Sequence, residues 1–509
     1  MIPVQKAQTG DQRPPASFVG QGLFCLVIFF FAGNFAVTIQ HGCGFCAGCA
    51  ALGVKNLTGL TVYDAVHVHP THCFVCGISV IGIKTAAHFF QHGGDGFCIL
   101  HVAAAGGANQ IFFLLNLMLF GINSGASVFL SQFWGTRDLK NVRRTMGMMY
   151  LLGAVAVTLF TLGAVLAPRF LVSFYVHEEP ALTMSASYLR IVGISYPVTA
   201  LSMILSMVCR CTGDVSIPTR ASFLSIGFNV GGNALLIFGL CGFPALGLEG
   251  AAIATALART VECLFLVLSV YRNRLPGAAK LRELFAFDRD FVAKYAKTAW
   301  PVLLNEMLWS VGTSLYSVAY GLLGTEALAA VQIANTAIQL LFVFTRGLSN
   351  ACGIFIGRTV GAGDRDKAID YGYRFAILLP ATGLLTGLVM IAIHPLFLAL
   401  YQVSAQTLAM ARTLLILQAL LLTVKADSMA LVVGIFRAGG DTLFACLLDT
   451  GTVWLVGVPL AFLGVWLGAP LWVVALLVAG DDMAKVAIGF VHLFREKWVK
   501  NVTQQIQEG

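Results

Sequence analysis

The residues of this chain that are best suited to chemistry are ionisable side chains set within long apolar segments. Glu306 is the clearest case, because it follows Lys297 by nine residues, which is about 13 Å of helix. An ionisable group inside a membrane span costs about 2.5 to 3.5 kcal/mol on insertion scales, so a function is its default interpretation. A carboxylate in that setting binds Na+ or takes up a proton. Pro301 frees a backbone carbonyl one turn away, which is a further oxygen for a bound cation.

More ionisable groups of this kind lie toward the C-terminus. Lys425 and Asp427 are two apart, so on a helix they point to different faces, and each is expected to find its partner on a neighbouring helix. Arg259 and Glu262 are three apart and can pair on one face. A cluster of carboxylates and bases suits a coupled exchange, because a substrate competes with Na+ or a proton for the same charge. The other members of the expected cluster are Asp449, Asp481, Asp482 and Lys485.

The composition identifies the class of protein to which these groups belong. Of the 509 residues 58% are hydrophobic and only 11% are charged, less than half of the ~25% that is typical of soluble domains. A soluble globule of this size could not cover its surface with so few charges. We therefore expect an integral membrane protein, and the composition excludes a cytosolic enzyme, a nucleic-acid-binding module and a disordered scaffold.

Uncharged runs long enough to cross the membrane recur along the chain. A spanning helix needs ~20 mostly apolar residues. One more helix is expected before residue 101, which makes twelve. The eleven segments that we expect to span are 101–133, 145–168, 182–208, 219–241, 247–271, 297–322, 326–357, 371–395, 405–435, 443–466 and 470–494.

Alternate loops differ in charge, which predicts the orientation. Loops 136–144, 209–220, 272–297 and 358–374 and the tail after Arg495 are basic, whereas the loops between them are acidic apart from Arg169. The positive-inside rule places the basic set, and with it both termini, in the cytoplasm. These loops account for the net charge of +8 without any nucleic-acid partner.

The chain contains an internal duplication. Eight identities fall within 31 gap-free positions at a constant offset of 226, among them Gly121 with Gly347 and Gly135 with Gly361. A later motif, Arg210-x2-Gly213-Asp214, repeats as Arg437-x2-Gly440-Asp441 at an offset of 227. Each repeat holds six helices, so the two halves insert in the same direction around an axis along the membrane normal. Parallel repeats of this kind build transporters whose substrate site lies between the halves near mid-membrane.

Several motifs resemble those of the multidrug and toxic-compound extrusion (MATE) family. The resemblance runs from about residue 103 to the C-terminus and implies two six-helix lobes in a V shape, with Na+- or H+-coupled export of organic cations and drugs. It also implies an essential carboxylate in the seventh helix, a pattern that Glu306 fits. The motifs are Gly121-Ile-Asn-Ser-Gly-Ala-Ser, Gln132-Phe-Trp-Gly135 with Asp138, Gly361-Ala-Gly-Asp364, Arg437-Ala-Gly-Gly-Asp441-Thr and Asn229-x3-Asn233-Ala-Leu-Leu-Ile-Phe-Gly.

For three further polar residues within the spans, the sequence allows more than one role. Asn229 and Asn233 lie four apart on one helical face and are expected to hydrogen-bond between helices, with substrate contact as the alternative. Arg346 contacts either an anionic group or a carboxylate of the cluster, or it packs as a structural residue. For Asp427, Asp449 and Asp481, a structural ion-pair network is the alternative to a function.

The first 102 residues break both the composition and the repeat. Seven of the 13 cysteines and seven of the ten histidines lie there, where the offset predicts the first helix at about 71–96. One interpretation is a metal site, since Cys43-x2-Cys46-x2-Cys49 and Cys73-x2-Cys76 resemble metal-ligand spacing. The simpler hypothesis is that residues 1–102 are not the family's coding frame. Translation of the upstream DNA in the other two frames tests it.

We conclude from the sequence that this is an all-α integral membrane protein, a twelve-helix, cation-coupled exporter of cationic amphipathic drugs in the inner membrane. It is expected to be a monomer with no enzymatic activity, no metal and no cofactor beyond the coupling ion, Na+ or H+. Its expected parts are 1–102, the rest of the N-terminal lobe at 103–271, a cytoplasmic linker at 272–296, and the C-terminal lobe with its tail at 297–509.

Two other functions remain possible from the sequence. One is a flippase of the same superfamily that moves a lipid-linked glycan; its cleft would carry more arginines, and few spans here contain one. The other is a membrane-bound redox or metal protein, which rests on the N-terminal cysteines alone and predicts bound iron or zinc.

Overall fold

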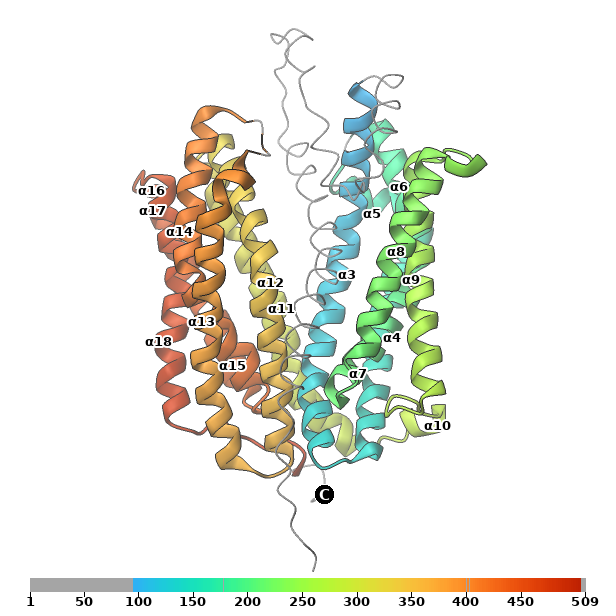
Figure 1. Cartoon of the computed structure of the whole chain (residues 1–509), viewed down its shortest axis with the longest axis vertical. Coiled ribbons are helices and arrows are strands. Elements are labelled where there is room, and N and C mark those ends of the chain that lie inside the picture. The colour runs from blue at the N-terminus through green and yellow to red at the C-terminus, as the bar shows by residue number, and fades with distance from the viewer. Residues whose placement is uncertain (1–94, 177, 400, 402, 505–509) are drawn as a thin grey trace, which may run out of the picture.

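The structure, a computed structural model, describes residues 95–176, 178–399, 401 and 403–504. The first helix expected at 71–96, the cysteine and histidine motifs, and the hypothesis about the coding frame therefore fall almost wholly outside the described residues. Within the described part the chain is helical, apart from one isolated bridge between Gly440 and Val499. Figure 1 shows two bundles of roughly parallel helices that lie side by side.

The first bundle, here the N-terminal lobe, holds the helices that precede the linker. Helices α6 and α7 are bent by 49° relative to each other, and only as a pair are they long and apolar enough to cross a membrane. The elements are α3 (Asp95–Gly135), α4 (Leu139–Leu166), α5 (Pro168–Ser173), α6 (Glu179–Gly193), α7 (Tyr196–Thr212), α8 (Ser216–Phe238), the short η3 (Leu240–Gly242) and α9 (Gly247–Arg272). The linker contains α10 (Leu281–Leu284).

The second bundle, here the C-terminal lobe, completes the chain. Two of its spans contain wider π-helical turns, η4 and η5, a feature that recurs at functional sites. The elements are α11 (Arg289–Leu322), α12 (Thr325–Gly361), α13 (Arg365–Leu398), α14 (Ala405–Met429), η4 (Ala430–Arg437), α15 (Thr442–Thr452), η5 (Val453–Gly457), α16 (Val458–Trp466), α17 (Leu471–Val478) and α18 (Gly480–Phe494).

Each of the eleven spans expected from the sequence coincides with a helix or with consecutive helices. Seven described helices are long and apolar enough to cross a membrane by themselves, and the bent pair α6 and α7 adds an eighth. Helix α11 begins at Arg289, eight residues before the expected start, and its first turns pack in the core of the N-terminal lobe through Phe291, Tyr295 and Ala299. The linker is therefore shorter than its charge pattern indicates.

The duplication is visible in the way equivalent helices begin. Helix α4 begins at Leu139 and α13 at Arg365, again 226 residues apart. The preceding aspartates, Asp138 and Asp364, cap these helices, since each carboxylate accepts a hydrogen bond from the backbone N–H three residues later.

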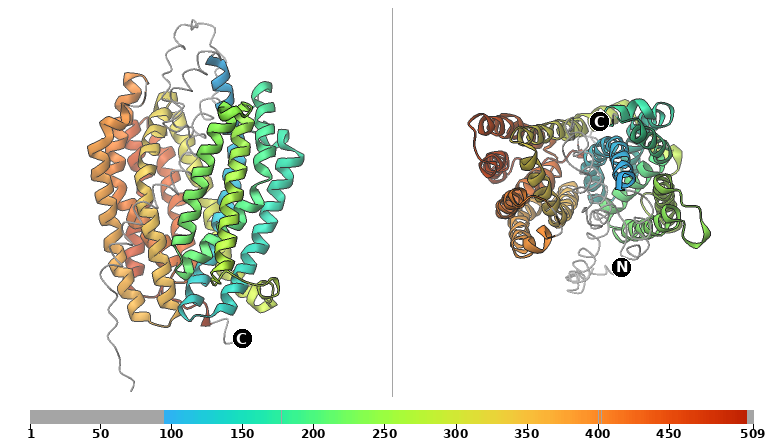
Figure 2. Two further views of the ribbon diagram at one scale, coloured as in Figure 1. Left: turned by 45° about the vertical axis from the view of Figure 1, so that its right-hand side comes forward. Right: turned by 90° about the horizontal axis from the view of Figure 1, so that it is seen from above.

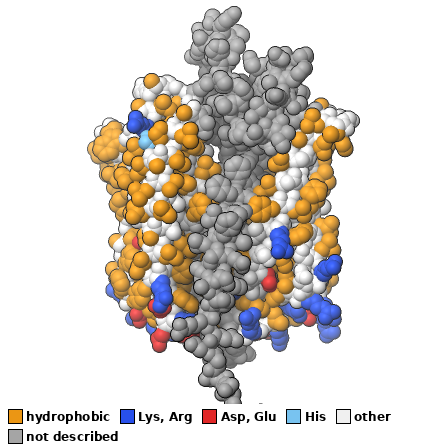
Figure 3. Space-filling view, viewed as in Figure 1, with side chains coloured by type: hydrophobic (Ala, Val, Ile, Leu, Met, Phe, Trp, Pro, Cys, Tyr) orange, Lys and Arg blue, Asp and Glu red, His pale blue; other side chains and the backbone are white. Residues whose placement is uncertain are grey.

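Charged side chains gather at one end of the molecule, called the basic end from here on, which contains the α3–α4, α7–α8 and α12–α13 turns, the linker and the C-terminal tail. Figure 3 shows Lys and Arg along this lower edge, with apolar side chains over the helices above it. Figure 2 shows the same two lobes from the side and from above. The apolar girdle between the ends is what a bilayer core requires.

The two lobes touch at the basic end through matching residues of the repeat. A Cβ added at Gly135 would meet the backbone of Arg358, Gly361 and Ala362, and one added at Gly361 would meet the backbone of Gln132. Because Gly135 and Gly361 are equivalent in the two repeats, α3 and α12 cross close to the axis that relates the lobes. Glycine is required at this crossing because the two backbones leave no room for a side chain.

The C-terminal tail also joins the lobes at the basic end. Trp498 is fully buried against Gly372 and Gly439 of the C-terminal lobe, whereas Val502 packs in the core of the N-terminal lobe. The backbone N–H of Val502 donates to Oε1 of Gln132 at 2.9 Å. The tail therefore acts as a clasp across both lobes.

Candidate functional site

Four of the predicted residues meet in the C-terminal lobe around the ammonium of Lys485. Its Nζ lies 3.0 Å from Asp449 Oδ1, 3.3 Å from Asp481 Oδ2 and 3.7 Å from Asp482 Oδ1. Lys485 is only 3% exposed. One ammonium faces three carboxylates, so two negative charges remain when all four groups are ionised. We call these four residues the acidic cluster.

The acidic cluster lies at mid-depth in its lobe. Asp481 follows the start of α17 at Leu471 by ten residues, which is about 15 Å of helix. Lys485 precedes the end of α18 at Phe494 by nine residues, a similar distance. Since the hydrocarbon core is about 30 Å thick, both ends of the cluster are remote from the aqueous surfaces.

Neighbouring helices position the cluster. The hydroxyl of Tyr316, on α11, donates to Asp481 Oδ2 at 3.1 Å. A Cβ at Gly457, at the end of η5, would overlap that hydroxyl and contact Asp481. The indole N–H of Trp454, also in η5, donates to the carbonyl of Leu308 on α11 at 3.1 Å. The absence of a side chain at Gly457 thus lets α11 approach closely enough to hold Asp481.

Asn305 connects the acidic cluster to the helix that carries Glu306. Its amide donates to Asp449 Oδ2 at 2.9 Å, and its carbonyl oxygen accepts from the hydroxyl of Thr450 at 3.0 Å. Asn305 itself is 1% exposed, while its two partners are half-buried. The two bonds fix the rotation of α11 relative to α15.

Glu306 points to the junction of the lobes rather than into the acidic cluster. Its Oε1 accepts from Nη1 of Arg437 at 2.8 Å, and the same nitrogen donates to the hydroxyl of Ser124 on α3 at 2.8 Å. Both Glu306 and Arg437 are buried. The predicted coupling carboxylate is therefore already paired with a base, and this ion pair touches the N-terminal lobe.

Lys425 and Asp427 do not pair with each other, as their spacing predicts. Asp427 is 6% exposed, and its Oδ1 has no hydrogen-bond partner among the described residues. The expected partner on a neighbouring helix is thus missing for this oxygen. Lys425 and Arg346 are exposed and both approach the ring of Phe342, at 5.4 and 5.7 Å from its centroid. Among the described residues, Arg346 forms no ion pair with a carboxylate of the acidic cluster.

The remaining predicted residues lie in the N-terminal lobe, apart from the acidic cluster. Arg259 and Glu262 form the pair that their spacing predicts, at 2.9 Å. Asn233 donates to Asn229 at 3.2 Å within α8, and Asn229 donates to Thr255 of α9 at 3.3 Å. The contact between helices that we expected is therefore made by Asn229, while Asn233 supports it.

Sequence reasoning missed several residues of the site. Arg437 was recognised as part of a repeated loop motif, but nothing local indicated that it would reach Glu306. Tyr316 and Asn305 are neutral residues in an apolar helix, so charge patterns cannot reveal them. The four charged members of the cluster were indicated by their ionisable side chains within apolar spans, and the repeat adds that Lys485 occupies the position equivalent to Arg259.

Comparison with known proteins decides the family. The MatE family model matches residues 99–235 and 301–463, more than half of the chain. The chain belongs to the MatE family. Among relatives of this MatE protein, the uncharacterized transporter YisQ of Bacillus subtilis is 26% identical over 73% of this chain and 82% of that protein. The probable multidrug resistance protein YoeA, from the same organism, is 28% identical over 72% and 82%.

Solved structures share the fold of this MatE protein. A MATE transporter in complex with MaL6 matches with a TM-score of 0.72 and 15% identity, over 93% of this chain and 96% of that chain. A MOP superfamily transporter from Pyrococcus furiosus, noted for the reverse polarity of its binding pocket, matches with a TM-score of 0.70 and 18% identity, over 78% and 89%. The MatE protein is thus a multi-pass membrane transporter with the twelve-helix, V-shaped fold.

Proposed function

We propose that this MatE protein is an antiporter of the inner membrane that exports organic cations, such as cationic amphipathic drugs, in exchange for Na+ or H+. The observation that carries the proposal is the acidic cluster, in which three carboxylates surround one buried ammonium. Two unbalanced negative charges at mid-depth are costly in a low-dielectric interior. A bound Na+ or a proton relieves that cost, so the cluster is a suitable site for the coupling ion.

Coupling requires that the loaded and the empty cluster favour different conformations. The cluster is linked to α11 through Asn305 and Tyr316, and α11 carries Glu306, whose ion pair reaches Ser124 in the other lobe. A change in charge at Asp449 or Asp481 therefore acts on the helix that touches both lobes. A cation shifts the equilibrium only by the difference in its affinity for the two conformations.

The contacts between the lobes indicate which state this is. Glycine packing and the tail clasp both hold the lobes together at the basic end. With the basic end and both termini in the cytoplasm, as the positive-inside rule indicates, this is the conformation that is closed to the cytoplasm. One chain supplies both lobes, so we take the monomer as the working unit.

Asp427 is a second candidate for cation binding in the same lobe. Its carboxylate is buried, and one oxygen lacks a hydrogen-bond partner among the described residues. An unpaired buried carboxylate is destabilising unless it binds a cation or a proton. We place Asp427 after the acidic cluster because no base or hydroxyl of the described residues organises it.

An exporter or flippase of anionic molecules, including lipid-linked glycans, is the second candidate function. Lys425 and Arg346 are exposed beside one aromatic ring, Phe342, an arrangement that suits a negatively charged ligand. Exchanging both bases for glutamine separates the two functions. Transport of a cationic dye should persist in Lys425→Gln/Arg346→Gln, whereas transport of an anion should fall; loss of cation transport alone would contradict both assignments.

Efflux from proteoliposomes under separately imposed Na+ and pH gradients tests the proposed antiport. One of the two gradients should accelerate efflux of a fluorescent organic cation, and collapsing that gradient should return the rate to its basal value. Glu306→Gln should uncouple efflux from the gradient, because the neutral amide cannot form the ion pair with Arg437. Equal rates with either gradient and with none would exclude cation coupling.

A further inference from the structure

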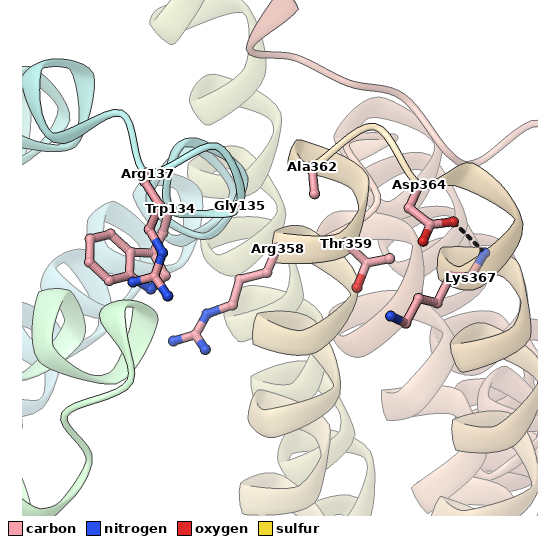
Figure 4. Close-up of a pocket in the computed structure, with 8 residues that line it drawn as sticks. All are labelled: Trp134, Gly135, Arg137, Arg358, Thr359, Ala362, Asp364 and Lys367. Carbon is pink, nitrogen blue, oxygen red and sulfur yellow. Dashed lines mark hydrogen bonds between the residues drawn. The ribbon is translucent and has the colours of Figure 1, made fainter. Parts of the chain in front are cut away.

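A cavity of about 250 Å³ opens between the two lobes at the basic end. Its walls are the α3–α4 turn, with Trp134 and Arg137, and the α12–α13 turn, with Arg358, Asp364 and Lys367. Figure 4 shows side chains from both lobes around this space. Pockets for drug-sized ligands measure about 300 to 1,000 Å³, so this cavity suits a small anion or the headgroup of a lipid. It is separate from the acidic cluster.

The positive charges around the cavity outnumber the negative charges within the described part of the chain. Arg137, Arg358 and Lys367 form no ion pair there, and Arg137 instead stacks on Trp134 with Cζ 4.3 Å from the ring centroid. The one carboxylate of the lining, Asp364, accepts a hydrogen bond from the backbone of Lys367 as a helix cap. Beyond the lining, the carboxylate of Asp214 interacts electrostatically with Arg358. Three positive charges against two negative charges leave one positive charge for a ligand.

Arg358 presents only part of its guanidinium to the cavity. Its Nε and Nη2 donate to the carbonyl of Cys211 at 3.0 and 2.7 Å. Nη1 has no hydrogen-bond partner among the described residues and remains for a ligand. These bonds anchor the side chain, so its position does not depend on the ligand.

Arg137 is held at the cavity in a backbone conformation that disfavours it. Its φ is 59°, in the left-handed region, and the equivalent residue of the second repeat is Gly363, with a φ of 84°. Left-handed backbone costs a residue with a side chain roughly 1 to 2 kcal/mol. Glycine is sufficient to form this turn, as Gly363 of the second repeat shows. The geometry of the turn therefore does not explain why an arginine stands at position 137. Its guanidinium over the cavity supplies that reason.

We propose that this cavity binds a phosphate group between Arg137 of the N-terminal lobe and Arg358 of the C-terminal lobe. Guanidinium groups match phosphate oxygens in shape and charge, and the single negative charge of a phosphodiester offsets the excess positive charge. The group comes either from an anionic lipid of the cytoplasmic leaflet or from a soluble phosphate. Trp134 is of a residue type that is enriched at membrane interfaces, and anionic lipids attract basic segments there.

Binding at this place would also affect the conformation. The two arginines come from different lobes, so a phosphate that bridges them binds best when the lobes meet at the basic end. It therefore stabilises the conformation that is closed at this end.

The test is a calorimetric titration of the purified full-length protein with three probes: dioctanoyl phosphatidylglycerol, dioctanoyl phosphatidylcholine and inorganic phosphate. Arg137→Gly removes one of the two guanidinium groups that would hold the phosphate, and it relieves the left-handed turn, so the variant should fold. Arg358→Gln introduces the residue type of the equivalent position, Gln132. The amide of Gln132 donates a hydrogen bond to a carbonyl without carrying a charge, so the variant should keep such a bond and lose the positive charge. Arg274→Gly is the matched control, because Arg274 is also an exposed arginine with a left-handed φ of 49°, on the basic linker outside the cavity.

Phosphatidylglycerol should bind more tightly than phosphatidylcholine, and each cavity variant should raise its Kd about 10-fold or more, while Arg274→Gly leaves the Kd unchanged. If phosphatidylglycerol binds and inorganic phosphate does not, the ligand is a lipid of the membrane. If both bind, a phosphate group alone is sufficient for binding. The proposal is overturned if no probe binds, or if Arg274→Gly weakens binding as much as Arg137→Gly does, since the attraction would then be unspecific.

Discussion

Gln132 and Arg358 stand at equivalent positions of the two repeats, and each donates hydrogen bonds to a helix end of the opposite lobe. Nε2 of Gln132 donates to the carbonyl of Ala438 at 3.3 Å, and Nη2 of Arg358 donates to the carbonyl of Cys211 at 2.7 Å. Cys211 and Ala438 are themselves 227 residues apart, the offset of that part of the repeat. The duplication has therefore produced a reciprocal lock that closes the basic end.

The glycine crossing is the part of this lock that is most sensitive to size. Gly361→Ala places a methyl group against the backbone of Gln132, and overpacking of this kind costs about 1 to 3 kcal/mol. The lobes should separate more often at the basic end, so Cys211, which is fully buried there, should react faster with maleimide. Mass spectrometry of the labelled peptide measures the rate.

Gly227→Ala is the control for that measurement, because an added Cβ at Gly227 meets nothing within 4 Å. Its labelling rate should equal that of the wild type. If Gly361→Ala also leaves Cys211 protected, the crossing of α3 and α12 does not hold the lobes together.

The tail clasp depends on one anchor. Trp498 is 0% exposed, and loss of a buried aromatic side chain costs about 3 to 5 kcal/mol. We expect Trp498→Ala to lower the free energy of unfolding by that amount and to loosen the tail from Gln132. Denaturant titration in detergent measures the loss. Trp466→Ala, at a site that is 81% exposed, should change stability little; equal effects of the two variants would mean that the tail is not anchored.

The acidic cluster depends on its single base. In Lys485→Gln three carboxylates share one buried site without a positive charge, and breaking a buried ion pair in this way costs about 3 to 5 kcal/mol. We expect a lower melting temperature that Na+ or low pH partly restores, because either supplies the missing positive charge. Lys497→Gln, at an exposed position on the tail, is the control. A variant with unchanged stability would show that the cluster is not charged as described.

Gly457 sets the distance between α11 and the cluster. Gly457→Ala places a methyl group on the hydroxyl of Tyr316 and should break its bond to Asp481. We expect an apparent affinity for the coupling cation that is about 10-fold weaker, equivalent to ~1.4 kcal/mol, without loss of folded protein. Gly451→Ala has free space around the added Cβ and should behave as wild type. Transport rates measured against cation concentration distinguish the two.

The sequence was sufficient for the features that depend on local pattern. Apolar length predicted the eleven spans, and the repeat predicted two halves of similar construction, which the equivalent helix starts after Asp138 and Asp364 confirm. The spacing of Arg259 and Glu262 predicted their pairing. Each of these follows from residues within a few turns of one another, or from the constant offset.

Contacts between distant helices could not be predicted in this way. Whether Glu306 meets the acidic cluster or Arg437 depends on how α11 is rotated, and that rotation is fixed by the bonds of Asn305 and by the close approach at Gly457. Asp427 was expected to find a partner, but the described residues of the helices beside it present none to its Oδ1. Rotation and distance of helices are properties of packing, and a single sequence does not encode them in a readable pattern.

Cation entry driven by substrate tests the central claim most directly. In proteoliposomes, an imposed gradient of an organic cation should drive uptake of Na+, followed as the radioactive ion, or of H+, followed with a pH-sensitive dye. Asp449→Asn and Asp481→Asn should abolish this uptake, whereas Glu262→Gln, which alters the ion pair of the N-terminal lobe, should retain it. Uptake that persists in both aspartate variants, or that is lost only in Glu262→Gln, would contradict coupling through the acidic cluster.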